Sequence, residues 1–228
     1  MLAVMYVGVD ACPRGWIAVR LHADGSVDAL VRPSLAELAE PLRGALGIGI
    51  DIPVGLARDR RRRADVDARA FVGPRRSSVF FAPVRQAVEA ATHAEANAAQ
   101  RARTGHGLSR QDYALAGRIL EAERWRGHAP APVWEVHPEV SFTVLSGRPP
   151  SAPKRTWAGA RERLDALASA GIEPGDLGSA GEQAGVDDVL DAAVVAWSAR
   201  RLAHGRGLSL PDPPEPDPET GAPMAIWA

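Results

Sequence analysis

The chain has 228 residues and a mass of 24.2 kDa, which suits one α/β domain or one core with a large insertion. Hydrophobic residues make up 46% of it and charged residues 24%, which excludes a chain that is disordered throughout. A single cysteine, Cys12, excludes a disulfide framework and a cysteine-based zinc site. No basic leader precedes Asp10, and no apolar run approaches the roughly 20 residues of a membrane span. We therefore expect a cytoplasmic protein that is not associated with a membrane.

The formal net charge is −1, but the basic residues are unevenly distributed. Residues 58–76 contain eight arginines against three aspartates, and Lys154 is the only lysine of the chain. A segment of this kind either binds phosphate groups or forms a solvated helix face. The average charge alone indicates no polyanionic partner.

The N-terminal part predicts three strands. Residues 4–9 form an apolar run that ends at Asp10, and residues 16–21 alternate between apolar and polar side chains. The dipeptide at 24–25, Asp-Gly, is a hairpin signal that joins the second strand to a third at 27–31. The first three elements are therefore strands in succession.

A helix and a fourth strand follow. Ser34 with Glu37 three residues later matches a capping box and predicts a helix to about Leu42. Residues 46–50 then predict a buried strand that ends at Asp51. The order of elements to this point is β-β-β-α-β.

A mainly helical insertion is predicted over residues 57–128, with helices in parts of 60–71, 84–103 and 109–126. A brief strand at 133–136 follows and is interrupted by Pro138. Two further helices are predicted at 161–170 and 186–203, the second with an apolar stripe. The tail, residues 209–228, is rich in proline, but its apolar end at 224–227 is expected to dock on the fold.

Acidic side chains recur where predicted strands end and where the last helix begins. Spacings of three and four residues place acids of the last helix on one side of it. Clustered carboxylates repel one another unless protons or cations neutralise them, and Mg²⁺ or Mn²⁺ prefers such oxygen ligands. Two such ions about 4 Å apart can promote phosphodiester cleavage. The acids are Asp10, Asp51, Glu135, Asp187, Asp188 and Asp191.

Each acid also has a purely structural interpretation. Asp187 and Asp188 can cap the last helix and complement its dipole, and Asp10 and Asp51 can be turn residues. Glu135 is harder to explain in this way, because glutamate is disfavoured in short interior strands. The joint placement of the acids is what favours a metal site.

The chain carries a series of short motifs: GVD at 8–10 with GW at 15–16, IDIPVGL at 50–56, SSVF at 77–80, EVHPEVSF at 135–142, DDVLDA at 187–192 and MAIW at 224–227. These motifs resemble those of a poorly characterised bacterial and archaeal family, DUF429, described as predicted nucleases of ribonuclease H-like fold. The resemblance spans nearly the whole chain, and the fourth and fifth motifs are the most specific. The chain departs from the family at 117–119, Gly-Arg-Ile, where Pro-Lys-Ile is more usual.

The resemblance implies an α/β fold, a ribonuclease H-like mixed five-stranded sheet flanked by helices. The helical insertion would lie between strands four and five of a single domain over residues 1–228. Asp10, Asp51, Asp188 and Asp191 would be catalytic and would bind the metal, Mg²⁺ or Mn²⁺, and Glu135 would join them as a catalytic residue. Arg118 is not assigned a catalytic role, because arginine and lysine differ in donor geometry.

Other residues are candidates for contact with a substrate, and each can also be structural. Arginines and serines of the basic segment can bind phosphate or cap a helix or strand, and the lone lysine can pair with phosphate or stay solvated. His137, Glu139 and Asp187 are possible additions to the site, and Cys12 is expected to be a packed thiol and not a nucleophile. The substrate-binding candidates are Arg61, Arg62, Arg75, Arg76, Ser77, Ser78 and Lys154.

Three functions stay open from the sequence. The first is a metal-dependent nuclease that hydrolyses phosphodiester bonds of DNA or RNA, with nucleic acid as its partner. The second is a non-catalytic module that binds nucleic acid or protein on the same fold. The third, an ATP-using phosphotransferase, requires a Gly-Ser/Thr phosphate loop after the first strand, and residues 10–14 (DACPR) lack it. The sequence predicts no oligomeric state.

Overall fold

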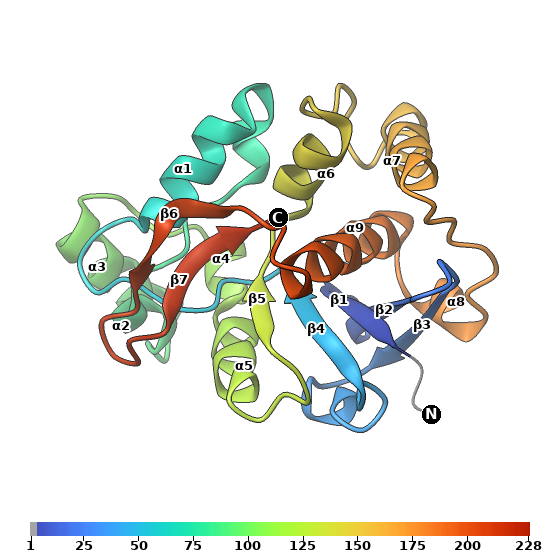
Figure 1. Cartoon of the computed structure of the whole chain (residues 1–228). Helices are drawn as coiled ribbons and strands as arrows, with labels where there is room; N and C mark the ends of the chain where they lie inside the picture. The colour runs from blue at the N-terminus through green and yellow to red at the C-terminus, as the bar shows by residue number, and fades with distance from the viewer. Residues whose placement is uncertain (1–3) are drawn as a thin grey trace.

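The computed structural model describes residues 4–228 and centres on one mixed five-stranded sheet (Figure 1). The strand order is β3-β2-β1-β4-β5; β1 pairs antiparallel with β2 and β2 with β3, whereas β1 with β4 and β4 with β5 are parallel. This confirms the predicted α/β class and is consistent with a ribonuclease H-like arrangement. Residues 1–3, which belong to the N-terminal segment expected not to be a leader, lie outside the described residues. The strands are β1 Met5–Cys12, β2 Gly15–His22, β3 Val27–Arg32, β4 Ala45–Ile50 and β5 Val133–Glu135.

The parallel pairing of β1 and β4 brings their carboxyl ends to one edge of the sheet. Val9 lies opposite Ile50, and the amide of Asp51 donates a hydrogen bond of 2.9 Å to the carbonyl of Val9. Asp10 directly follows Val9 and Asp51 directly follows Ile50, so the two aspartates lie side by side.

Helices cover both faces of the sheet. Helix α9, Val186–Ala203, packs across β1, β4 and β2 on one face, with Ala192, Ala193 and Ala196 in the core (Figure 1). Helix α5, Ala116–Arg126, contributes Ile119 and Trp125 to the core on the other face. The sheet is buried on both sides, which explains the nearly continuous apolar runs of β1 and β4. No helix in residues 4–228 has the length and hydropathy needed to span a membrane.

Two glycines allow the backbone of α9 to lie directly on the sheet. A Cβ atom at Gly8 would lie 1.9 Å from the carbonyl oxygen of Ala192, and one at Gly49 would lie 2.7 Å from a methyl of Val195. Both distances are shorter than any packing contact allows, so only glycine fits under the helix. The glycine in the Gly-Val-Asp motif therefore sets the distance between β1 and α9.

The insertion between β4 and β5 is helical, as predicted, but its helices are shorter. The single helix expected over 84–103 is divided at Thr92, whose hydroxyl accepts from the Glu95 amide while the Glu95 carboxylate accepts from the Thr92 amide. This capping box starts a new helix, a local signal that outweighs the apolar periodicity. The elements are α1 Arg63–Phe71, the 3₁₀ helix η2 Gly73–Ser78, α2 Arg85–Val88, α3 His93–Thr104, α4 Arg110–Ala114 and α5.

One predicted helix was wrong, and one helix of the structure was not predicted. The helix expected from Ser34 to Leu42 is only a 3₁₀ turn, η1 Ala36–Leu38, because the Ser34 hydroxyl donates to the Glu37 carboxylate and caps no amide. Conversely, Pro138 does not merely end a strand: it occupies the first turn of α6, Pro138–Ser146, where a missing N–H costs nothing. The remaining helices are α7 Trp157–Ser169 and α8 Ser179–Gln183.

The proline-rich tail forms a hairpin of β6, Ser209–Pro216, and β7, Pro223–Trp227, which packs on α1 (Figure 1). Met224 and Ile226 are buried, and Trp227 forms a parallel bridge to Val136 just beyond β5. The expected docking of residues 224–227 is confirmed. The tail is a strand pair and not an extended linker, since the prolines lie where few ladder hydrogen bonds are required.

We expect Gly8→Ala to lower the free energy of unfolding by about 1–3 kcal/mol, because the added methyl group collides with the backbone of α9. Gly117→Ala is the matched control: a Cβ at Gly117 meets no described atom within 4 Å, and alanine is favoured in a helix by up to about 1 kcal/mol. Chemical denaturation of both variants measures the difference. Equal stability of the two would contradict direct packing of α9 on β1.

Candidate metal centre

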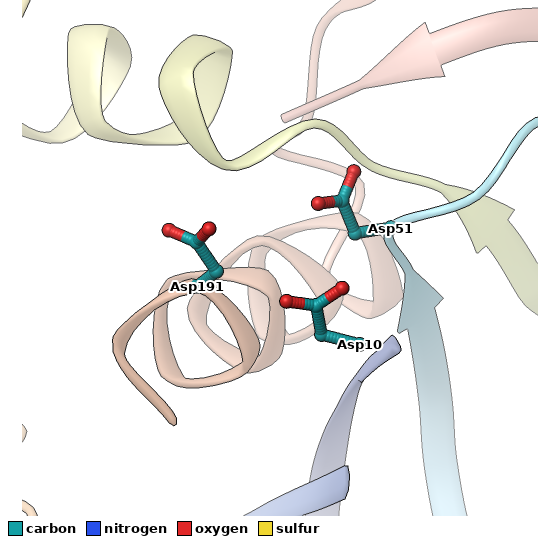
Figure 2. A group of neighbouring side chains, drawn as sticks. All are labelled: Asp10, Asp51 and Asp191. Carbon is teal, nitrogen blue, oxygen red and sulfur yellow. The ribbon is translucent and has the colours of Figure 1, made fainter. Parts of the chain in front are cut away.

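Three aspartates from three different elements converge at the edge of the sheet. Asp10 lies near the end of β1, Asp51 directly follows β4, and Asp191 lies on α9 (Figure 2). One carboxylate oxygen from each lies within 4.8 Å of the others. This spacing allows one ion to contact all three side chains.

The electrostatics of the cluster are unfavourable without a cation. Burial, followed by the charges of Asp51 and Asp191, raises the pKa of Asp10 well above its ordinary value. Burial and the Asp191 charge raise the pKa of Asp51 to about 8, and burial raises the pKa of Asp191 to about 6. Desolvation and like-charge repulsion therefore oppose full ionisation of the three carboxyl groups.

Lys154 provides the only positive charge in contact with these three aspartates among the described residues. Its Nζ lies 2.5 Å from Oδ2 of Asp191, which is 2% exposed. Burial acts to lower the pKa of Lys154, but the ion pair with Asp191 outweighs it and the pKa is raised. The cluster is therefore only partly neutralised by the chain itself.

The donor set fits a hard divalent cation. Carboxylate oxygens are the ligands that Mg²⁺ and Mn²⁺ prefer, and Asp10 and Asp51 accept few hydrogen bonds from the described residues that would compete. Beside the cluster, Oε2 of the buried Glu139 has no hydrogen-bond partner within residues 4–228, which indicates that a polar group outside the chain satisfies it. A cavity of about 20 Å³, lined in part by Asp51, Glu135 and His137, has room for about one water molecule.

Asp188 was expected to bind the metal, and Asp187 was expected as a possible addition to the site. Both lie outside this group of three. Asp188 Oδ2 accepts a hydrogen bond of 3.1 Å from the amide of Gly185, so its carboxylate caps the start of α9. Asp187 pairs with the exposed Arg155 at 3.1 Å. Both residues thus have structural partners, and within residues 4–228 Asp191 is the acid of this helix that belongs to the group of three, while the charge of Asp188 still acts to raise the pKa of Asp10.

Glu135 and Arg62 bind each other, which corrects the roles expected of both. Arg62 is 1% exposed and donates to Glu135 and Asp65 from the interior, so it cannot contact a substrate. Glu135 also accepts a 2.7 Å hydrogen bond from the amide of Val54. The pair thereby ties the loop that follows Asp51 to β5 and to α1, and Glu135 also lines the cavity beside Asp51.

Glu139 and His137 hold α6 in place. The buried Arg163 of α7 donates to Oε1 of Glu139 at 2.5 Å, and the Glu139 amide donates to Nδ1 of His137 at 3.2 Å. Burial lowers the pKa of His137 to about 4, so the ring is neutral near pH 7 and caps the helix as an acceptor. Cys12 is likewise a buried thiol, and burial raises its pKa.

The other substrate-binding candidates lie in and near η2. Arg61 stacks over the ring of Phe81, with its guanidinium carbon 3.8 Å from the ring centre, and Arg75 donates to the carbonyl of Pro150. Their side chains therefore have structural partners. Three candidates are exposed, namely Arg76, Ser77 and Ser78.

Two features of the structure were missed from the sequence. Trp157, the first residue of α7, is 79% exposed and lies three residues after Lys154, although tryptophan is usually buried. Arg118 donates to the carbonyls of Gly15 and Cys12 and so clamps the turn between β1 and β2. In the sequence, the arginine of the Gly-Arg-Ile segment, where lysine is more usual, was the one indication of this role of Arg118.

Together, the fold and the site define an α/β protein with a buried aspartate cluster that can hold a metal ion. The model of one family, described as "Protein of unknown function (DUF429)", matches residues 8–216, and the chain belongs to this family. No curated protein and no solved structure matches the chain.

We expect Asp51→Asn to stabilise the metal-free protein, and more so at pH 8.5 than at pH 5. A carboxyl group whose pKa rises from about 4 unfolded to about 8 folded binds its proton more tightly in the folded state, so stability falls as the pH rises between these values. Each pKa unit corresponds to about 1.4 kcal/mol, and we expect a gain on the order of 1 kcal/mol or more at the higher pH. Denaturation in EDTA at the two pH values measures it.

With Mn²⁺ at a hundredfold excess over its dissociation constant, an intact site adds roughly 2.7 kcal/mol to the free energy of unfolding. Asp51→Asn should lose this gain, and Asp188→Asn should keep it, because Asp188 lies outside the group of three. Loss of the gain in the Asp188 variant would restore that residue as a ligand.

Proposed function

We propose that the protein is a divalent-metal-dependent phosphodiesterase that cleaves DNA or RNA in the cytoplasm. The observation that carries this proposal is the convergence of Asp10, Asp51 and Asp191 within 4.8 Å at the carboxyl edge of the sheet. These three residues would hold Mg²⁺ or Mn²⁺. A bound ion of this kind supplies Lewis-acid chemistry, which activates a water molecule and stabilises negative charge on phosphate oxygens.

Close packing and a buried ion pair hold these residues in position. The Gly8 contact fixes α9 and its Asp191 against β1, and the Arg62–Glu135 pair fixes the loop that carries Asp51. The ligands are thus held by regular elements and by buried ion pairs and not by mobile loops, which is what a preorganised site requires.

The rim of the site suits a polyanion. Arg76, Ser77 and Ser78 are exposed on the insertion, and Arg155 is exposed on the segment that carries Lys154. Positive rim charges offset the repulsion between phosphates and the acidic cluster. Trp157 adds an exposed aromatic surface on which an unpaired base can stack.

The two other functions have less support. The connection from β1 to β2 consists of Pro13 and Arg14 alone, and Arg118 clamps it, so it does not form the phosphate loop of a phosphotransferase. A non-catalytic module that binds polyanions gains nothing from three buried carboxylates that repel its ligand.

The test is cleavage of end-labelled single-stranded DNA, duplex DNA and RNA with Mn²⁺ or Mg²⁺. Asp10→Asn and Asp51→Asn should reduce cleavage to background while the melting temperature without metal is kept or raised, and Asp188→Asn should retain activity. EDTA should abolish cleavage by the parent. Cleavage that persists in EDTA or in the Asp51 variant would contradict the proposal.

We further expect Trp157→Ala to weaken binding of single-stranded oligonucleotides by about tenfold, because stacking on an aromatic ring contributes roughly 1–3 kcal/mol per base. Trp157→Phe should retain most of the affinity, and Phe71→Ala, at a partly exposed phenylalanine of α1, is the control for loss of surface apolar area. Fluorescence anisotropy with Mn²⁺ and the inactive Asp10→Asn background measures the affinity. Unchanged binding in the Trp157→Ala variant would exclude stacking there.

A further inference from the structure

We infer that the centre takes one divalent cation per chain, and that the ammonium group of Lys154 supplies the positive charge that a second cation would supply elsewhere. This inference rests on the proposed function and specifies its metal requirement. It differs from the two-ion chemistry that is one way to cleave a phosphodiester.

The first argument is the number of free carboxylates. Within residues 4–228, the group whose oxygens lie within 4.8 Å of one another has three members. The neighbouring acids have other partners: Asp188 accepts from an amide at the start of α9, and Glu135 and Glu139 are each held by a buried arginine. Apart from Oε2 of Glu139, which has no hydrogen-bond partner within residues 4–228, a second ion would have to share the same three ligands.

The second argument is charge. Asp10, Asp51 and Asp191 carry three negative charges when ionised, and the Lys154 ammonium in contact with Asp191 removes one of them. The two that remain equal the charge of a single divalent ion. A second ion would leave an excess of positive charge in a site where burial makes charge costly.

The third argument is that Lys154 is built into the site by its backbone. The carbonyl of Pro153 accepts from both the amide and the hydroxyl of Thr156, and the Thr156 hydroxyl in turn accepts from the amide of Gly159. A Cβ atom at Gly159 would lie 2.0 Å from the Pro153 carbonyl oxygen, so α7 begins directly against this segment. Lys154 therefore extends from a fixed turn and is not a freely moving surface lysine.

The chemical consequence is a division of roles. An ammonium group neutralises charge and donates hydrogen bonds, but it is not a Lewis acid. Lys154 can therefore offset negative charge on a phosphate oxygen and cannot itself activate water. It is a charge-stabilising residue of the site.

The experiment counts bound Mn²⁺ by electron paramagnetic resonance of free Mn²⁺ during titration of the full chain. The parent should bind one Mn²⁺ per chain. Lys154→Gln removes the ammonium and should bind Mn²⁺ about tenfold more tightly or take up a second ion, because a close positive charge opposes binding of a cation. Arg161→Gln is the matched control, and its Mn²⁺ affinity should stay within about twofold of the parent, since Arg161 is exposed and pairs with Asp165 on the surface of α7.

Two results would overturn the inference: two Mn²⁺ ions bound per parent chain, or equal affinity and stoichiometry in parent and Lys154→Gln. The count in the parent does not depend on the folding of any variant. The experiment measures bound Mn²⁺ and not cleavage, so the inference and the proposed function can fail independently of each other. Binding of one ion without cleavage contradicts the proposed phosphodiesterase alone, and two ions with cleavage contradict the role of Lys154 alone.

Discussion

The direct contact between the backbone of α9 and the sheet determines most of what this molecule can do. Gly8 and Gly49 remove the side chains that would hold the helix away, and Ala192 and Ala196 are small enough to complete the contact. A helix at this distance places its first buried acid, Asp191, level with the carboxyl ends of β1 and β4. Three charges that repel are held together by apolar packing, which is the dominant favourable term in folding and does not depend on charge. The site is therefore a consequence of the core and not of attraction among its own members.

Buried arginines divide the acids of this region into two kinds. Arg62 holds Glu135 and Asp65, and Arg163 holds Glu139, so these carboxylates are compensated and connect elements to one another. An arginine presents a rigid fork of donors, which suits it for such connections. Asp10 and Asp51 have no arginine within ion-pair distance in residues 4–228, and their pKa values rise because burial and neighbouring charge are left uncompensated. Burial also raises the pKa of Glu135, so it is the lack of an arginine partner that distinguishes Asp10 and Asp51.

The sequence contains enough to predict the strands and to place two of the three candidate ligands, Asp10 and Asp51, beside each other. Asp10 and Asp51 follow apolar runs, and parallel strands bring such residues to one edge. The third candidate could not be singled out, because a step of three on a helix places Asp188 and Asp191 on the same side of it. In the structure the amide of Gly185 holds the Asp188 carboxylate at the start of α9. The roles of Arg62 and Glu135 were inaccessible, since residues 73 positions apart pair only through the fold. The helix boundary at Thr92 could have been predicted, because Thr92 and Glu95 have the spacing of a capping box.

The Lys154–Asp191 ion pair lowers the cost of bringing three acidic side chains together at this centre. Full ionisation of three buried carboxylates would subtract several kcal/mol from a stability that is typically about 5–15 kcal/mol. Protonation relieves this cost, as the raised pKa values of Asp10 and Asp51 indicate, and the Lys154–Asp191 ion pair relieves it further without protons. A second buried cation of the chain would leave one negative charge of the three for an external ion to neutralise. In the proposed centre, a lysine in contact with one aspartate lowers the cost of assembly while the other two keep their affinity for a cation.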